Sequence, residues 1–439
     1  MKKIILISAL LILQQSAFLH GQEARLAVPS QIQYAWQEQE RIMFIHLGMA
    51  TWQNKEYDDG HFDLSRVNPT KLNTDDWCKV AKSWGAKEII FVAKHAGGFC
   101  WWPTHTTEYC VRNIPWKNGK GDLLAEVAAS CKKTGLKLGI YIYPGDGEYG
   151  AGDGGVTKDP SKQEAYNKIY RKQLTEILSL YGVISEVWFD GSCKIDVSDI
   201  LQKYARKSVI FQGPMASIRW PGTESGKLDY PVWNTVSSAA LKTGVSTQKD
   251  DNPDGDAWAP LEADIPLYNH YWFWAPSNES KRKTLPELME IYYKSVGYGG
   301  VLLINASPDT NGVIVPGDQA LYKKFGEELK NRFGKPLKEI QNISGNTAEI
   351  VFSRPTSVNH TILMENYLKG QRIRSYTIEG YIGGQWKILS SGISAGRKKI
   401  DTFPDVTVSR LRLTVNKSVG IPLIRSFSAF FIKDFNKNR

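Results

Sequence analysis

Cysteine is scarce in this chain of 439 residues. Its five cysteines form neither a CxxC pair nor any Cys/His pattern with metal-ligand spacing. Cys78 and Cys131 fall within helical patterns and are expected to be small core residues. At most one or two disulfides could form, and no feature of the sequence requires one. A zinc centre is therefore not expected, and the sequence predicts no metal and no cofactor.

Long apolar runs are also missing beyond the N-terminus. No later stretch reaches the roughly 18 uninterrupted apolar residues of a membrane-spanning helix. The first residues, Met1-Lys2-Lys3, are basic, residues 4–13 are apolar, and small and polar residues follow. This pattern is typical of a secretory signal peptide, here residues 1–21. We therefore expect an exported protein, periplasmic or extracellular, without a membrane span.

Positive charge is concentrated at one end of the chain. The formal net charge is +10, but residues 336–439 hold sixteen Lys/Arg against seven Asp/Glu. The remainder is nearly neutral, which does not support a nucleic-acid-binding surface. The basic C-terminal region is either a solvated lysine-rich face or a surface for acidic glycans.

Apolar segments rich in β-formers alternate with helical patterns over the first 300 or so residues. The candidate strands are Arg41–Met49, Glu88–His95, Lys137–Asp146, Glu186–Gly191, Val209–Pro214, Tyr230–Val236, Tyr268–Ala275 and Gly300–Ser307. The candidate helices are Asn73–Trp84, Asp122–Thr134, Ser161–Tyr181, Ile195–Arg206, Leu285–Val296 and Gln319–Asn331. Eight strands that alternate with helices predict an α/β fold, a (β/α)8 barrel over residues 22–334.

The pattern changes at residues 333–336, after which no helical period is visible. Short alternating strands follow, and Gly383-Gly384 is a hairpin signal between two of them. The expected strands are Thr347–Ser353, Thr361–Met364, Ser375–Ile382, Trp386–Ser390 and Ser409–Val415. Residues 335–439 are thus predicted to form a β-sandwich, either a carbohydrate-binding or a packing module.

The most informative segment is Glu186–Gly191, in which apolar and aromatic residues lead directly into Asp190 and a glycine. A buried parallel strand followed by a turn has this pattern. Asp190 would then lie at the carboxyl end of a barrel strand, where barrel enzymes place catalytic groups. A carboxylate fixed there between aromatic residues suits attack on a sugar carbon. The alternative is an aspartate that only caps the next helix.

Other polar and aromatic residues also follow strands. His46 and His95 end the first two candidate strands, and Tyr141 lies on the third. Histidines there could bind sugar hydroxyls while tryptophan and tyrosine stack on the sugar ring. The aromatic candidates for substrate binding are Tyr57, Trp101, Trp220, Trp233 and Trp272.

A glycosidase also needs a carboxyl group that protonates the leaving oxygen. Glu224 is the strongest candidate, because it lies in a glycine-rich loop beside its own tryptophan. Glu56 and Glu262 are rivals on the same reasoning.

Ordered motifs across nearly the whole mature chain resemble glycoside hydrolase family 29, the retaining α-L-fucosidases, and most closely the branch that acts on α-1,3- and α-1,4-linked fucose. The resembling segments include FIHLG (44–48), VNPTKLNTDDW (67–77), AKHAGGFCWWP (93–103), LKLGIYIYP (136–144), YGVISEVWFDG (181–191), RWPGTESG (219–226) and LLINASPDTNGVI (302–314). The resemblance implies a barrel with a C-terminal sandwich and a fucosylated oligosaccharide or glycoconjugate as substrate.

The resemblance also implies roles for particular residues. Asp190 matches the family's nucleophile and Glu224 the acid/base of that branch. His46 and His95 match donors to sugar hydroxyls, and Tyr141 matches an active-site tyrosine. Glu56-Tyr57 matches a Glu-Trp pair near the sugar.

Three departures from the family pattern bear on specificity. The chain has Ala96-Gly97 where the family has histidine and aspartate, Tyr57 where it has tryptophan, and no evident arginine before the Trp-Phe segment, where Tyr268 or Asn269 stands. These changes predict a sugar site with fewer donors and more room. We therefore expect poor activity on simple fucosides, or a modified sugar such as an L-galactoside. A glycan-binding homologue without strong catalysis and an adhesion or scaffold protein are the remaining alternatives.

Overall fold

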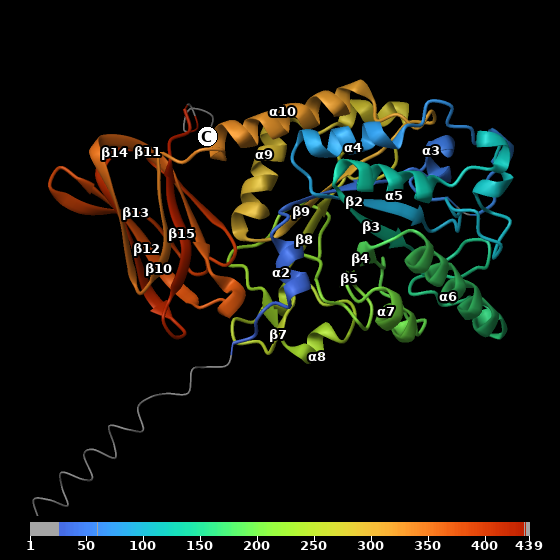
Figure 1. The fold of residues 1–439 in the computed structure, drawn as a ribbon, viewed down its shortest axis with the longest axis horizontal. Coiled ribbons are helices and arrows are strands. Elements are labelled where there is room, and N and C mark those ends of the chain that lie inside the picture. Colours follow the sequence, from blue (N-terminus) through green and yellow to red (C-terminus); the bar gives the residue numbers. More distant parts are fainter. Residues whose placement is uncertain (1–25, 59, 434, 436–439) are drawn as a thin grey trace, which may run out of the picture.

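The computed structural model describes residues 26–58, 60–433 and 435, so the predicted signal peptide lies outside the described residues. Its first domain is built on a parallel sheet of seven strands in the order β5-β4-β3-β2-β1-β9-β8 (Figure 1). The strands are β1 (Arg41–Ile45), β2 (Glu88–Lys94), β3 (Lys137–Ile142), β4 (Ile184–Trp188), β5 (Val209–Phe211), β8 (Glu262–Ile265) and β9 (Val301–Ala306). The predicted α/β barrel class is confirmed.

The gap between the two edge strands is closed by a segment too short to count as a strand. Ile218 forms a parallel bridge with Phe211 of β5, and Arg219 forms one with Leu261, just before β8. The Arg219 guanidinium is buried, and it donates to the carbonyl oxygens of Ala259 (2.8 Å), Thr247 (2.8 Å) and Trp233 (2.9 Å). Ile218-Arg219 therefore takes the eighth place in the barrel.

Helices lie around the sheet, and Trp36 of the first one packs among residues inside the barrel. The helices are α2 (Gln31–Gln37), α3 (Met49–Gln53), α4 (Thr74–Ser83), α5 (Leu123–Thr134), α6 (Gln163–Leu180), α7 (Ser198–Tyr204), α8 (Ser238–Leu241), α9 (Leu285–Lys294) and α10 (Pro316–Phe333). Their ends follow from the sequence. Asp122 caps α5 by accepting from the Ala125 N–H, and Gly135 ends it in the left-handed region at φ 74°. Thr284 and Glu287 form a capping box at the start of α9.

Two strands expected from the sequence are wrong. At Tyr230–Val236 only β6 (Thr235–Val236) forms, and it pairs antiparallel with β7 (Ala257–Trp258) outside the barrel sheet. Tyr268–Ala275 contains no strand, because the chain has already left the barrel at the end of β8. The pattern misled because aromatic-rich loops resemble buried strands, whereas β8 contains Glu262 and Asp264 and looks polar.

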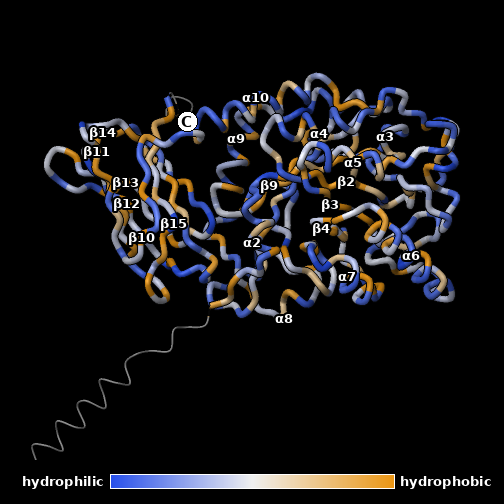
Figure 2. The backbone as a smooth tube through the Cα atoms, in the orientation of Figure 1, coloured by the Kyte–Doolittle hydropathy of each residue, from blue (hydrophilic) through white to orange (hydrophobic). Residues whose placement is uncertain are grey.

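The C-terminal domain is an antiparallel sheet of six strands in the order β10-β15-β11-β14-β12-β13. Its strands are β10 (Lys338–Ser344), β11 (Thr347–Glu365), β12 (Ile373–Ile382), β13 (Gln385–Gly392), β14 (Lys399–Ser418) and β15 (Leu423–Phe430). Two of the predicted strands are the two halves of β11, which is interrupted by a register shift between Val351 and Thr356. The sheet has a hydrophobic core of its own. In the barrel domain, Figure 2 shows hydrophobic stretches along inner strands such as β2 and β3.

Part of the excess positive charge of the C-terminal domain faces the barrel domain. Arg425 donates to the Glu38 carboxylate at 2.9 Å, and the buried Arg397 donates to Glu40 at 2.6 Å. The Tyr367 hydroxyl also donates to Glu38, at 2.6 Å. Some of these basic residues therefore attach the two domains to each other. The sequence suggested only a solvated face or a surface for acidic glycans.

All five cysteines are buried and none forms a disulfide. Across the part of the chain that the structure describes, no helix combines the length and apolarity needed to cross a bilayer.

Candidate active site

Asp190 lies just beyond the end of β4, where the sequence places it. Its side chain is half-buried, and the carboxylate accepts a hydrogen bond of 3.0 Å from the hydroxyl of Tyr141 on β3. Burial raises the pKa of Asp190 to about 6; the Tyr141 bond opposes this rise, and the negative charges of Glu224 and Asp153 add to it. Asp190 is therefore ionised at neutral pH but is poised close to protonation.

His46, after β1, is fixed in one tautomer by its neighbours. Its Nδ1 lies 2.7 Å from Oδ1 of Asn305. The Asn305 amide nitrogen donates to the Trp272 carbonyl oxygen (2.7 Å) and to the Ser307 hydroxyl (2.9 Å), so Oδ1 must accept. His46 Nδ1 therefore carries the proton. Burial lowers the pKa of His46 well below its ordinary value, so neutral His46 keeps Nε2 as an acceptor, not the donor that the resemblance implies.

His95, after β2, completes an aromatic cluster with residues of neighbouring strands and loops. Its ring stacks on Tyr141, with centroids 5.6 Å apart, and on Tyr57 at 6.2 Å, and it meets His46 edge-on at 5.9 Å. Burial lowers the pKa of His95 to about 4, so the ring is neutral at physiological pH.

Trp272 connects the two glutamates that were considered as proton donors. Its backbone N–H donates to Glu56 Oε1 at 2.6 Å, and its indole N–H donates to Glu224 Oε2 at 3.1 Å. Its ring lies 5.0 Å from that of His46. Burial raises the pKa of Glu56 to about 7, against the lowering effect of backbone hydrogen bonds from Trp272 and Phe273. Both glutamates thus belong to the same site as the two histidines.

The loop that carries Glu224 is anchored where it begins. Before it lies the buried Arg219, and the Trp220 indole N–H donates to Asp264 Oδ1 at 2.7 Å. Glu224 itself is exposed. The site therefore combines an exposed carboxyl group with the half-buried Asp190, and the charge of Glu224 raises the pKa of Asp190.

Comparison with known proteins agrees with this geometry. Residues 24–332 match the family model described as alpha-L-fucosidase. The chain is 31% identical to Alpha-L-fucosidase 1 of Arabidopsis thaliana, over 94% of this chain and 88% of that protein. The chain belongs to the α-L-fucosidase family.

Solved structures from the same family have the same architecture. A glycoside hydrolase 29 family member from an unknown rumen bacterium is 31% identical, with a TM-score of 0.82 over 94% of this chain and 79% of that one. A Bacteroides thetaiotaomicron protein assigned to the α-L-fucosidases is 33% identical, with a TM-score of 0.87 over 93% of this chain and all of that one. The chain is thus a glycoside hydrolase of the α-L-fucosidase type, whose substrate is a fucosylated glycan.

Three residues proposed for the site of this fucosidase lie elsewhere. Trp101 is a core residue whose indole N–H donates to the Leu47 carbonyl oxygen at 2.6 Å. Trp233 is buried against Arg374 of the C-terminal domain, whose guanidinium lies 4.7 Å from a ring of the indole. Glu262 is fully buried inside the barrel. Strand-end position alone did not separate these core residues from exposed ones.

The expected extra room at Gly97 is also wrong. A Cβ atom on residue 97 would lie 2.0 Å from Oδ2 of Asp58. The space that glycine leaves open is therefore filled by a carboxylate from another segment of the fucosidase.

Two residues that shape the site were not found from the sequence. Asn305, at the end of β9, could have been found by the strand-end rule that identified Asp190. Asp153 accepts a hydrogen bond from the Tyr143 hydroxyl and raises the pKa of Asp190. It lies in a glycine-rich loop, where the sequence carries no signal that distinguishes one aspartate from another.

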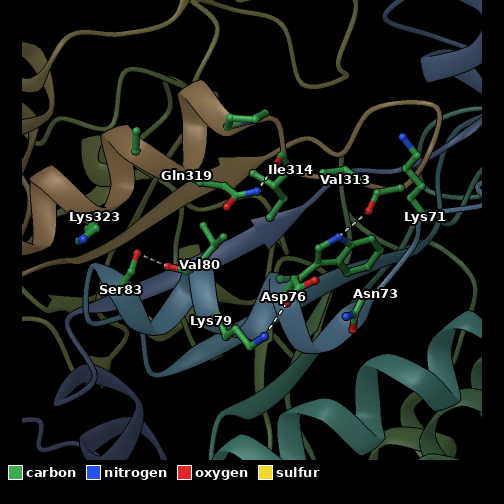
Figure 3. Close-up of a pocket in the computed structure, with 14 residues that line it drawn as sticks. Lys71, Asn73, Asp76, Lys79, Val80, Ser83, Val313, Ile314, Gln319 and Lys323 are labelled. Atoms are coloured by element: carbon green, nitrogen blue, oxygen red, sulfur yellow. Dashed lines mark hydrogen bonds and ion pairs between the residues drawn. The ribbon is translucent and has the colours of Figure 1, made fainter.

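A separate hollow lies between α4 and α10 in this fucosidase and has a volume of about 560 Å³. Figure 3 shows Asp76 and Lys79 of α4 opposite Gln319 and Lys323 of α10. None of the candidate catalytic residues lines it. Among residues 26–58, 60–433 and 435, no group of three His, Cys, Asp or Glu side chains could hold a metal ion.

Proposed function

We propose that this enzyme is an exported exo-fucosidase that works by double displacement with retention, with Asp190 as nucleophile and Glu224 as acid/base. The observation that carries the proposal is the environment of Asp190. Asp190 is half-buried just beyond the end of β4, its carboxylate accepts from Tyr141 at 3.0 Å, and the charge of the exposed Glu224 raises its pKa. Two carboxyl groups in such different surroundings suit the two different roles of the mechanism.

In the first step, a carboxylate oxygen of Asp190 attacks the anomeric carbon of the terminal fucose. The bond from that carbon to the glycosidic oxygen breaks, and Glu224 gives its proton to the departing oxygen. In the second step, Glu224 takes a proton from water as the water oxygen attacks the anomeric carbon. The ester bond to Asp190 breaks, and α-L-fucose leaves with its original configuration.

The remaining residues bind the sugar. The neutral Nε2 of His46 accepts from a fucose hydroxyl, while Tyr57, Trp220 and Trp272 cover the apolar face of the ring. We propose the α-1,3/α-1,4 branch because the acid/base segment, residues 219–226, matches that branch. Since Asp58 fills the space beside Gly97, the structural reason for an L-galactoside substrate is removed.

The test is a product assay on fucosyl oligosaccharides with α-1,2, α-1,3, α-1,4 and α-1,6 linkages. We expect turnover mainly of the α-1,3 and α-1,4 compounds. Proton NMR during the first turnovers should show the α-anomer of fucose before mutarotation. Early release of the β-anomer would exclude retention, and a preference for α-1,2 or α-1,6 linkages would exclude the branch.

Export is tested separately by fractionating cells of the native host. The mature chain, beginning near residue 22, should appear in the periplasmic or extracellular fraction. Full-length protein confined to the cytoplasm would contradict export.

A further inference from the structure

The loop that brings Glu56 and Tyr57 to the site is tied down by the next residue, Asp58. Residues 54–58 follow α3, and Asn54 ends that helix in the left-handed region at φ 53°. Beyond this turn the exposed Tyr57 stacks over His95, while Glu56 accepts from the Trp272 N–H at 2.6 Å. A short loop with one exposed aromatic residue needs a fixed point to stay in this position.

Asp58 supplies that fixed point, because its side chain turns inward while its neighbours face the sugar site. The carboxylate is buried and accepts three hydrogen bonds, from the Gln53 amide (2.9 Å), the Gly60 N–H (3.2 Å) and the Tyr109 hydroxyl (2.9 Å). Among the described residues no lysine, arginine or histidine forms an ion pair with it. A buried carboxylate held by neutral donors depends on all of them.

Gly97 makes this arrangement possible. A Cβ atom there would lie 2.0 Å from Asp58 Oδ2 and 2.5 Å from its Cγ, distances at which the carboxylate must move. Gly60 is also constrained, since its own Cβ would lie 2.8 Å from the Glu148 backbone nitrogen and 2.9 Å from the Gly97 carbonyl oxygen. The cavity beside Asp58, Gly97 and His95 measures only about 10 Å³. It is too small to accept a displaced carboxylate.

We propose that Asp58 is a positioning residue for the fucosidase reaction: its carboxylate occupies the space that Gly97 leaves open and thereby holds Glu56 and Tyr57 at the sugar site. The proposal rests on the proposed function, in which these two residues contact the fucose. Asp58 does not touch the substrate. It sets affinity for the sugar through its two neighbours in the chain.

The test compares Asp58→Ala and Gly97→Ala with the conservative Asp58→Asn. The first two free the loop in different ways, one by removing the anchor and one by displacing it. We expect each to raise KM for an aryl α-L-fucoside about tenfold, with a much smaller change in kcat, because uniform binding is lost while Asp190 and Glu224 remain. Asp58→Asn keeps the shape and most of the hydrogen bonds and should stay within about threefold of wild type.

Asp63→Ala is the matched control, because Asp63 is an exposed carboxylate that caps the next 3-10 turn, Leu64–Arg66. Its KM should be unchanged. An unchanged KM in Asp58→Ala or Gly97→Ala, or an equal rise in Asp63→Ala, would overturn the proposal.

Amide hydrogen exchange provides a readout that does not depend on turnover. The Trp272 N–H bonded to Glu56 should exchange faster in Asp58→Ala and Gly97→Ala but not in Asp58→Asn. If the wild type hydrolyses no fucoside, the proposed function fails while this measurement still decides the anchoring. Unchanged exchange at Trp272 in both alanine variants would overturn it, and Gly97→Ala keeps the test valid should Asp58→Ala fail to fold.

Discussion

Two pairs of carboxyl groups lie in the same barrel, and they differ in their position and in their exposure to solvent. Glu186 and Asp190 both come from β4 and the residues that follow it. Inside the barrel Glu186 meets Glu262, and both are fully buried. At the carboxyl end Asp190 is coupled to Glu224, which is exposed. The comparison shows that position along one strand decides whether a carboxyl group is structural or available for catalysis.

The interior pair behaves as a single unit. Glu186 accepts from the Trp36 indole at 2.6 Å and Glu262 from the Trp188 indole at 2.8 Å, which leaves the second oxygen of each carboxyl group without a donor among the described residues. Burial raises both pKa values, that of Glu262 to about 8. Two neighbouring carboxylates in the barrel interior cannot both be ionised, so we expect them to share a proton. The outer pair is separated into two environments, which allows one group to attack while the other donates a proton.

The largest effect should come from Asp190→Ala. Removing the attacking carboxylate should lower kcat at least about 10⁴-fold, measured on an activated aryl fucoside, while the fold is retained. Exogenous azide should restore part of the rate by attacking in place of Asp190. Glu186→Gln, on the same strand, is the matched control and should remain active. Retention of more than a few per cent of the wild-type rate in Asp190→Ala would show that another group is the nucleophile.

Glu224→Ala should be nearly as damaging, but only for some substrates. Oligosaccharides, whose leaving groups need a proton, should lose about 10²–10⁴-fold in rate, whereas aryl fucosides with good leaving groups should lose far less. Steady-state kinetics on both substrate types measures the difference. Equal losses on both, or a larger differential loss in Glu56→Ala, would move the acid/base role away from Glu224.

Tyr141→Phe should change the pH profile more than the maximum rate. Asp190 must be ionised to attack, so kcat/KM should fall as the pH falls through its pKa of about 6. The Tyr141 hydroxyl stabilises the ionised form, so removing it should move this acid limb about one unit to higher pH. An unchanged limb would mean that a different group controls activity at low pH.

The smallest effect should be on stability, from Glu186→Gln. A carboxyl whose pKa is raised in the folded state contributes stability that is fully present below its unfolded pKa of about 4.3 and is lost as the pH rises through the folded value. Glutamine can accept from Trp36 and donate to Glu262 without needing that proton. The free energy of unfolding should therefore fall less between pH 5 and pH 8 than in wild type, by about 1 kcal/mol or more, in urea titrations. Parallel losses in both proteins would show that the pair does not share a proton.

Where local pattern and burial coincide, the sequence was sufficient. The apolar and aromatic residues before Asp190 identified β4 and the catalytic end of the barrel, because parallel strands buried on both faces are mostly apolar. Helices α4, α5, α6 and α9 were predicted to within a few residues, since their apolar period and their caps are both local. The motifs that resemble family 29 also named the fold and the type of enzyme correctly.

The tertiary structure alone decided which side chains share a space. Trp101 and Trp233 are as aromatic as Trp272, yet only Trp272 lies at the site, because burial depends on what packs against a residue. The glycine at position 97 suggested extra room in the sugar site. That space is filled by the carboxylate of Asp58, which lies 39 positions earlier in the sequence. Local periodicity in the sequence indicates that a residue is buried or lies at a strand end. The partner that it meets there is set by the packing of distant segments.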